Sequence, residues 1–290
     1  MSHETIAVTN TEAQAAAPAK INLTLRVLGR RPDGYHELES VVARVSLCDQ
    51  VIVRKCSAPG IMLTCDRPDL PVDANNLAYR AARLLLADAN VEQGLEIELR
   101  KQIPPGAGLG GGSSNAATTL ELVNQLCGIN YSTERLAALG GQLGADIPLF
   151  LWPSPSVMRG IGHDVETLSR GLQGGVVLVL PEIHCSTADV YRAWKALQES
   201  EGAPAGEIEK AMGDPERLLQ LCGNDLEPAA FRVVPALAEL GAKLRDVAGQ
   251  PVRMSGSGSA FFTITPDETR AAELAQRLAD ATGVRCVACR

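Results

Sequence analysis

A glycine-rich stretch at residues 104–115, with the sequence PPGAGLGGGSSN, contains the residue types from which proteins build phosphate-binding loops. Glycines let a backbone adopt positive φ and approach a ligand closely. An alternation of apolar and charged residues typical of a strand precedes the stretch, and residues 116–126 follow with helical periodicity, which puts Leu120, Val123 and Leu126 on one side. A helix that begins here would present unpaired N–H groups and a positive dipole end to an anion. The pattern predicts a loop that holds a polyphosphate.

Three interpretations of this loop stay open on the residues alone. It could be a flexible surface turn. It could belong to a dinucleotide fold, because Gly106, Gly108 and Gly111 fit G-x-G-x-x-G, but the acidic residue expected about 20 positions later is missing. It could be an ATP loop of another type than Walker A, because no Gly-Lys-Ser/Thr follows it. In that case the positive charge beside the phosphates must come from elsewhere in the chain.

An early strand places a lysine and an asparagine side by side. Residues 19–27 alternate with period two, so that one face is apolar and the other polar. The apolar face contains Ile21, Leu23, Leu25 and Val27, and the other contains Lys20, Asn22 and Thr24. Taken alone, the polar face indicates a solvent-exposed edge. The alternative is that the lysine and the asparagine do chemistry.

Two further positions have a structural and a functional interpretation that the sequence does not separate. Tyr35 and His36 follow a Pro-Asp-Gly turn, where they could form a binding edge or close the end of a barrel. Asp146 stands between an alanine and an Ile-Pro-Leu-Phe-Leu run. An acid in such an apolar neighbourhood is a helix cap or a functional carboxylate, because a buried acid needs a partner.

Composition narrows the class of protein. The chain has 290 residues and a net charge of −7, which argues against a nucleic-acid scaffold and a polybasic membrane anchor. Its longest apolar run, residues 176–180, is too short to span a bilayer. Residues 1–17 fit neither a secretory signal nor a transit peptide, and we predict a disordered tail there. The 8 cysteines are scattered, as reduced core residues of a cytoplasmic enzyme are, and Cys286 and Cys289 lack the second pair that a zinc site requires.

Periodicity and breaker residues give the order of the elements. Prolines and glycines interrupt the sequence pattern after Trp152, so we predict a domain boundary near residue 165. The second half is expected to be an α+β sandwich that contains another glycine-serine loop at residues 253–262. The predicted strands are 19–27, 41–53, 95–100, 175–180, one that follows the second glycine-serine loop, and 284–287. The predicted helices are 75–89, 116–126, one starting at Ser132, one starting at Ser186 and 267–281, with a helical region from residue 224 to about residue 247.

Several of these motifs together resemble the GHMP kinases, the superfamily of galactokinase, homoserine kinase, mevalonate kinase and phosphomevalonate kinase. Residues 104–115 resemble the second motif of that family, residues 18–23 the first and residues 254–262 the third. Residues 31–36, 144–148 and 224–227 are similar to one branch of it, which phosphorylates a cytidine-diphosphate ester of methylerythritol in the non-mevalonate route to isoprenoid precursors. One such motif is weak evidence, whereas several in the same order are strong.

The resemblance implies a two-domain α+β fold with the active site in the cleft between the domains. The N-terminal domain, residues 18–165, would be like the second domain of a small-subunit ribosomal protein, and the C-terminal domain, residues 166–290, would be a ferredoxin-like α/β sandwich. It also implies an ATP- and Mg²⁺-dependent kinase that acts on the 2-hydroxyl of a small molecule carrying a cytidine diphosphate. Neither nucleic acid nor membrane is an expected partner, and the protein would be a monomer or a homodimer.

The resemblance also assigns residues to the site. Lys20 matches the catalytic lysine and Asp146 the catalytic acid, whose pKa the lysine would lower. Ser114 matches a Mg²⁺ ligand, although the choice between it and Ser113 stays open. The implied substrate residues are Asn22, Tyr35, His36, Thr187 and Tyr191. The implied ATP residues are Pro104, Pro105, Gly106, Ala107, Gly108, Leu109, Gly110, Gly111, Gly112, Ser113 and Ser114, with Gly256, Ser257 and Gly258 in the supporting loop. Kinases of other small alcohols and a nucleotide-binding regulator without turnover are the alternatives.

Overall fold

The computed structural model describes residues 6–32, 34, 36–160, 162, 164–194, 200 and 202–290. The chain divides into two compact units by its internal contacts. Unit 1 comprises residues 1–19, 47–105 and 110–153, and unit 2 comprises residues 20–46, 106–109 and 154–290.

Unit 1 combines a sheet with three helices. Its strands lie in the order β1-β2-β3-β5-β4, where β5 pairs antiparallel with β3 and parallel with β4. The strands are β1 (Ala7–Val8), the first part of β2 (Glu12–Arg30), the last part of β3 (His36–Cys56), β4 (Ile61–Cys65) and β5 (Gly94–Arg100). The helices are α1 (Leu77–Asp88), α2 (Gly111–Leu126) and α3 (Thr133–Gly141), followed by the 3₁₀ turn η1 (Pro148–Phe150).

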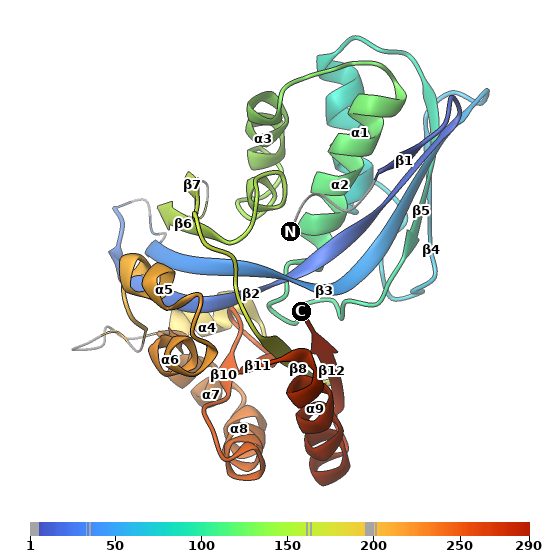
Figure 1. Ribbon diagram of the computed structural model, residues 1–290. Helices are drawn as coiled ribbons and strands as arrows, with labels where there is room; N and C mark the ends of the chain where they lie inside the picture. Colours follow the sequence, from blue (N-terminus) through green and yellow to red (C-terminus); the bar gives the residue numbers. More distant parts are fainter. Residues whose placement is uncertain are drawn as a thin grey trace. The chain divides into compact units, whose positions relative to one another are not determined.

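Helices α1 and α3 begin within two residues of their predicted starts. The Asn76 side chain accepts a hydrogen bond from the N–H of Ala78 and caps α1, and the Ser132 side chain caps α3 in the same way. Helix α2 lies beside α1 (Figure 1) and buries Leu120, Val123 and Leu126, as the periodicity predicts. It starts five residues earlier than expected, directly behind the glycine loop. The loop and the helix therefore form one continuous feature.

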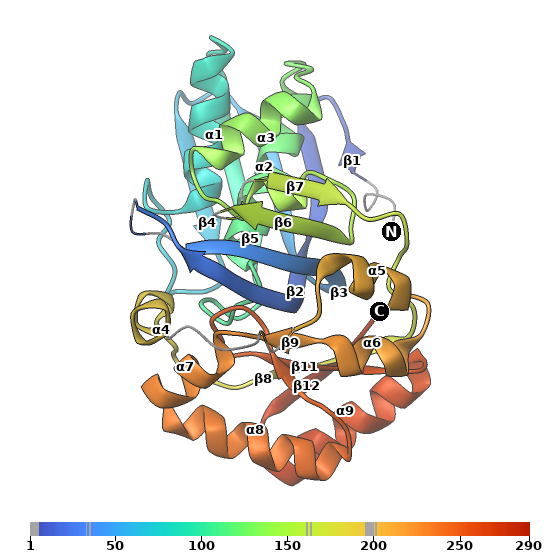
Figure 2. The ribbon, with the colours of Figure 1, turned by 90° about the vertical axis from the view of Figure 1, so that its left-hand side faces the viewer.

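Unit 2 is built on a four-stranded antiparallel sheet in the order β10-β11-β8-β12. Helix α9 packs on β8 and β12, and α8 lies beside α9 (Figure 2). These strands are β8 (Gly175–Leu180), β10 (Arg253–Met254), β11 (Phe261–Thr265) and β12 (Arg285–Cys289). The helices are α4 (Thr187–Ala193), α5 (Ala205–Ala211), α6 (Pro215–Leu221), α7 (Glu227–Val233), α8 (Pro235–Ala248) and α9 (Glu268–Thr282).

A second group of strands belongs to unit 2. The first part of β3 pairs antiparallel with β6 (Ser156–Gly160), which pairs in turn with β7 (Asp164–Thr167). The last part of β2 pairs parallel with the short β9 (Gly223–Asn224). The paired residues of β2 are Thr24 and Leu25, which closely follow the predicted functional residue Asn22.

Several sequence expectations need correction. The predicted tail is wrong for residues 12–17, which belong to β2 and fully bury Ala13 and Ala17. The predicted helical region 224–247 consists of two helices, because the backbone of Val234, with φ −133° and ψ 85°, is not helical and Pro235 starts a new helix. Helices α5 and α6 and strands β4, β6 and β7 were not predicted. The domain boundary near residue 165 stays a prediction. Among the described residues, no helix has the length and apolarity to cross a membrane.

Candidate active site

The glycine loop has the backbone that its sequence predicts. Gly106, Gly108 and Gly110 all have positive φ, at 68°, 77° and 70°. Gly110 is also the cap residue of α2, and no side chain caps that helix. The first turn of α2 contains no acidic residue that would compete for its N–H groups. The start of α2 is thus a suitable binding position for an anion.

The two predicted glycine-serine loops contact each other within unit 2. A Cβ atom on Gly108 would lie 2.1 Å from the carbonyl oxygen of Ser255, so only glycine fits. The Ser255 hydroxyl donates to the Gly108 carbonyl at 3.1 Å, and the N–H of Ala260 donates to the Ala107 carbonyl at 3.1 Å. The sequence predicted that the loops work together, and the second loop does support the first one here.

The second loop is itself fixed by a buried asparagine. The Asn224 side chain donates to the carbonyl oxygens of Met254 at 2.8 Å and Gly256 at 2.7 Å, and its own oxygen accepts from the N–H of Leu226. The sequence identifies Asn224 only as part of a motif shared with the family. Its position shows the physical reason for that residue type, because an amide both donates to two carbonyls and accepts from one N–H.

The polar face of β2 is buried rather than exposed, contrary to the interpretation of that face taken alone. Lys20 and Asn22 are each 4% exposed. The Lys20 Nζ donates to Asn22 Oδ1 at 2.5 Å, and Asn22 Nδ2 donates to the Ser40 hydroxyl at 2.8 Å. The N–H of Lys20 donates to the Leu109 carbonyl at 3.0 Å, which joins this strand to the glycine loop. The Lys20 ammonium group thus belongs to a buried hydrogen-bond network on the strand that contacts the glycine loop.

Unit 1 carries the predicted serines and the predicted acid. Ser114 is fully buried, and its hydroxyl has no hydrogen-bond partner among the described residues, whereas Ser113 is partly exposed. Asp146 is half-buried in the turn before η1, where Ile147 is the cap residue. Asp146 is therefore not the cap of that helix, which removes one of the two interpretations left by the sequence.

Unit 1 contains a buried cluster, built on an ion pair, that joins residues before and after the glycine loop. The sequence alone did not predict it. Lys101, just before the loop, pairs with Asp49 of β3, and its Nζ also donates to Asn115 Oδ1 at 2.7 Å. Asn115 Nδ2 donates to Asp49 Oδ2 at 2.9 Å. Asp49 Oδ1 accepts from the N–H groups of Gln102 at 2.7 Å and Ile103 at 2.9 Å. The cluster ties the chain before the loop to the first turns of α2.

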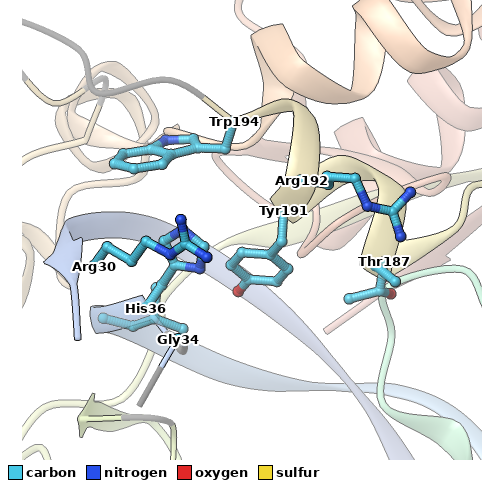
Figure 3. A pocket seen from close by; sticks show the side chains of 9 residues that line it. Arg30, Gly34, His36, Thr187, Tyr191, Arg192 and Trp194 are labelled. Carbon is cyan, nitrogen blue, oxygen red and sulfur yellow. The ribbon is translucent and has the colours of Figure 1, made fainter. Parts of the chain in front are cut away.

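A cavity of about 640 Å³ in unit 2 contains three of the predicted substrate residues (Figure 3). Tyr191 stacks on the His36 imidazole with ring centroids 5.2 Å apart and an angle of 30°. The Thr187 hydroxyl hydrogen-bonds the Ser257 hydroxyl at 2.7 Å, which connects this wall to the second glycine-serine loop. Burial, together with the charge of Arg30, lowers the pKa of His36. The cavity is lined by Arg30, Gly34, His36, Leu38, Thr187, Ala188, Tyr191, Arg192 and Trp194.

Of the two remaining predicted substrate residues, the structure describes Asn22 alone. The Asn22 side chain binds Lys20 and Ser40 and is not among the residues that line this cavity. Tyr35 lies outside the described residues. Arg30 and Trp194 line the cavity but were not predicted, because isolated residues without a motif give no signal. The substrate roles of Asn22 and Tyr35 stay predictions.

No site of clustered metal ligands occurs in the described part of the chain. No group of three or more His, Cys, Asp or Glu side chains is arranged to hold an ion. Cys286 and Cys289 belong to β12, and burial raises the pKa of the Cys286 thiol to about 11. A thiol that stays protonated is a poor nucleophile and a poor metal ligand.

Comparison with known families matches both parts of the chain. A profile described as the GHMP kinases N terminal domain matches residues 76–153, and one described as GHMP kinases C terminal matches residues 205–284. The first match includes the glycine loop and α2, and the second covers much of unit 2.

Two relatives are similar over nearly the whole chain. The 4-diphosphocytidyl-2-C-methyl-D-erythritol kinase of Citrifermentans bemidjiense is 42% identical over 270 residues, covering 93% of this chain and 95% of the relative. The kinase of the same name from Pelotomaculum thermopropionicum is 42% identical over 265 residues, covering 91% and 92%.

Solved structures of kinases have the same fold. A crystal structure of 4-(cytidine 5'-diphospho)-2C-methyl-D-erythritol kinase has a TM-score of 0.83 at 38% identity and covers 95% of this chain and 98% of its own. Homoserine kinase from Cytophaga hutchinsonii has a TM-score of 0.73 at 20% identity, covering 97% and 95%, which shows a common fold alone.

Proposed function

The chain belongs to the GHMP kinase family, and on that premise we propose that it transfers the γ-phosphoryl group of ATP to the 2-hydroxyl of 4-diphosphocytidyl-2-C-methyl-D-erythritol. The products would be ADP and the 2-phosphate, an intermediate of the non-mevalonate route to isoprenoid precursors. The observation that carries the proposal is the 42% identity over 93% of the chain with a relative of that name. The aromatic cavity in unit 2 and the glycine loop are the local features that support it.

The glycine loop is assigned to the phosphates of ATP. The N–H groups of Gly111, Gly112 and Ser113 lie in the uncapped first turn of α2, where the helix dipole favours negative charge. Residues 106–109 closely approach the second glycine-serine loop of unit 2. Hydrogen bonds to the Gly256 carbonyl and the Ser257 hydroxyl hold this second loop in place. A rigid loop reduces the ordering cost that a bound polyphosphate would otherwise impose.

Lys20 and Asp146 are assigned to the transfer itself, and their motifs support this. Phosphoryl transfer spreads negative charge over the equatorial oxygens, so catalysis consists mostly of positioning and electrostatic stabilisation. Lys20 supplies the cation that a Walker lysine provides elsewhere, and Asn22 orients its ammonium group. Asp146 orients the substrate 2-hydroxyl and accepts its proton as the new bond forms.

Mg²⁺ is the ion that this chemistry requires, and Ser114 is the residue that would hold it. A buried hydroxyl without a partner is costly, and an ion or a phosphate oxygen would satisfy it. The ion supplies positive charge that neutralises the β- and γ-phosphates. A single serine oxygen fits Mg²⁺, because this ion is commonly held by few protein oxygens together with substrate phosphates.

The cavity in unit 2 is assigned to the cytidine moiety. His36 offers hydrogen bonds to the base, while Tyr191 and Thr187, both on α4, form the wall opposite it, where Tyr191 offers a flat aromatic face. Stacking of a base on an aromatic side chain contributes about 1–3 kcal/mol. We also propose that the protein works in the cytoplasm, as a monomer or a homodimer.

The proposal is tested by measuring ADP release with four acceptors. We expect turnover with the diphosphocytidyl ester, and none above background with free methylerythritol, homoserine or mevalonate. Homoserine and mevalonate kinases are the relevant comparison, because they have the same fold. Turnover of homoserine or mevalonate in preference to the ester would assign the chain to another branch, and no ADP release with any acceptor would make it a non-catalytic nucleotide binder.

A further inference from the structure

The cavity assigned to cytidine has an aromatic wall that the proposed function does not use. Trp194 follows the last residue of α4 and lines the cavity together with His36 and Tyr191. We propose that Trp194 is a specificity-determining residue that fixes the orientation of His36 and so makes the site select cytosine over uracil. This inference rests on the proposed function, because it concerns the same substrate pocket.

The His36 ring is held from two directions. Tyr191 stacks on its face at 5.2 Å, and Trp194 meets it at 5.2 Å with an angle of 80° between the ring planes. Figure 3 shows the indole and the phenol ring approaching the imidazole from two sides. A rotation of the imidazole about its Cβ–Cγ bond would sweep its ring atoms through space next to the indole. Removal of the indole would free that rotation.

The orientation of His36 decides which base it recognises. A neutral imidazole has one N–H donor and one bare nitrogen acceptor at different corners of the ring. Cytosine presents an amino donor at the position where uracil presents a carbonyl acceptor. In a given tautomer, a fixed ring therefore matches one base and leaves polar groups unpaired with the other, whereas a ring free to flip turns its other nitrogen toward the base and accommodates both.

The charges around the ring are consistent with an uncharged imidazole. Arg30 and Arg192 both line the cavity, and Arg192 pairs with Asp189 on the same helix at 2.6 Å. Burial and the charge of Arg30 lower the pKa of His36, so it keeps its acceptor nitrogen at neutral pH.

The indole has a second feature that points to a ligand. Its Nε1 atom is buried and has no hydrogen-bond partner among the described residues. A buried N–H group without an acceptor is unfavourable. A bound cytidine diphosphate supplies oxygen acceptors, so Trp194 would donate to the ligand as well as orient His36.

A merely structural role must be distinguished, because Trp194 also packs against the hydrophobic core of unit 2. Phe231 provides a matched control. It is a partly buried aromatic residue on the same core cluster, and it does not line the cavity. Loss of either ring removes core packing, but only the loss of Trp194 affects the base.

The first experiment compares binding of CDP and UDP by isothermal titration calorimetry. We expect the wild-type protein to prefer CDP, and Trp194→Ala to lose most of that preference, a change of roughly 5- to 30-fold in the affinity ratio. Trp194→Phe keeps a ring beside His36, so it should retain the preference while binding both nucleotides more weakly. Phe231→Ala should retain the wild-type ratio. An unchanged ratio in Trp194→Ala, or equal weakening of CDP and UDP, would overturn the proposal.

A second measurement does not depend on the stability of Trp194→Ala. The chain contains 2 tryptophans, Trp152 and Trp194, so Trp152→Phe leaves Trp194 as the single indole reporter. CDP should change its emission with a midpoint equal to the calorimetric Kd. Unchanged emission at saturating CDP would place the nucleotide away from Trp194. Failure of either test in an enzyme that still phosphorylates the diphosphocytidyl ester would reject this inference alone, whereas absence of that turnover would reject the proposed function.

Discussion

Replacing Asp49 with asparagine should destabilise unit 1 and loosen the glycine loop. The carboxylate accepts from two backbone N–H groups on one oxygen and from Lys101 and Asn115 on the other. An asparagine amide cannot satisfy this set, because its NH₂ group would face two donors in either orientation. The substitution also leaves the ammonium of Lys101, whose side chain is 5% exposed, without its counter-charge.

Breaking a buried ion pair from one side costs about 3–5 kcal/mol, which is a large part of the 5–15 kcal/mol that holds a typical protein folded. Urea denaturation followed by circular dichroism measures the free energy of unfolding. The double variant Asp49→Asn with Lys101→Met removes the unpaired charge and should recover part of the loss. The KM for ATP should rise in Asp49→Asn, because residues 101–103 lead directly into the loop.

The matched control is the exposed ion pair of Arg67 and Asp69, whose side chains are 44% and 51% exposed. Asp69→Asn should leave the urea midpoint unchanged within error, because solvent screens exposed charges. If Asp49→Asn unfolds at the same urea concentration as Asp69→Asn, the buried cluster does not stabilise unit 1 and the reasoning is refuted.

Three further predictions concern the proposed site. Asp146→Asn should lower kcat by about 10²–10⁴-fold, while the Kd for ATP, measured by calorimetry, changes little. A kcat within tenfold of wild type would show that Asp146 is not a catalytic residue. Ser114→Ala should raise the Mg²⁺ concentration for half-maximal rate without lowering the urea midpoint, because it deletes a buried hydroxyl that has no partner in the described part of the chain. An unchanged Mg²⁺ dependence would contradict the assignment. The pKa of His36 is lowered in the folded state, so the unfolded state binds the proton more readily and His36 costs stability as pH falls below 6.5. The difference in urea midpoint between wild type and His36→Gln should therefore shift against wild type on going from pH 7.5 to pH 5.5, and a constant difference would show that the pKa is not lowered.

Features determined by local physics could be predicted from the sequence. The positive φ of Gly106, Gly108 and Gly110, the cap of α3 at Ser132 and the apolar side of α2 each depend on a residue and its near neighbours. Glycine, cap residues and helical periodicity have the same effect in most folds, which is why these predictions are confirmed.

Features determined by distant contacts could not be predicted. Burial of the polar face of β2 depends on Ser255, whose hydroxyl accepts from the N–H of Asn22 across 233 positions. The cluster around Asp49 joins residues up to 66 positions apart. Alternation in a strand reports that one face is apolar, but it does not report what covers the other face. Trp194 has no motif around it, so only its position against His36 identifies it.

The central claim is that this chain makes a phosphomonoester on the 2-oxygen of a cytidine-diphosphate ester. Phosphorus NMR of the reaction with ATP, Mg²⁺ and 4-diphosphocytidyl-2-C-methyl-D-erythritol tests it directly. We predict one new phosphomonoester resonance, formed in equal amount to ADP, with the diphosphate bridge of the substrate intact. ADP with inorganic phosphate as the only other phosphorus product, or a phosphate attached at another hydroxyl, would contradict the account.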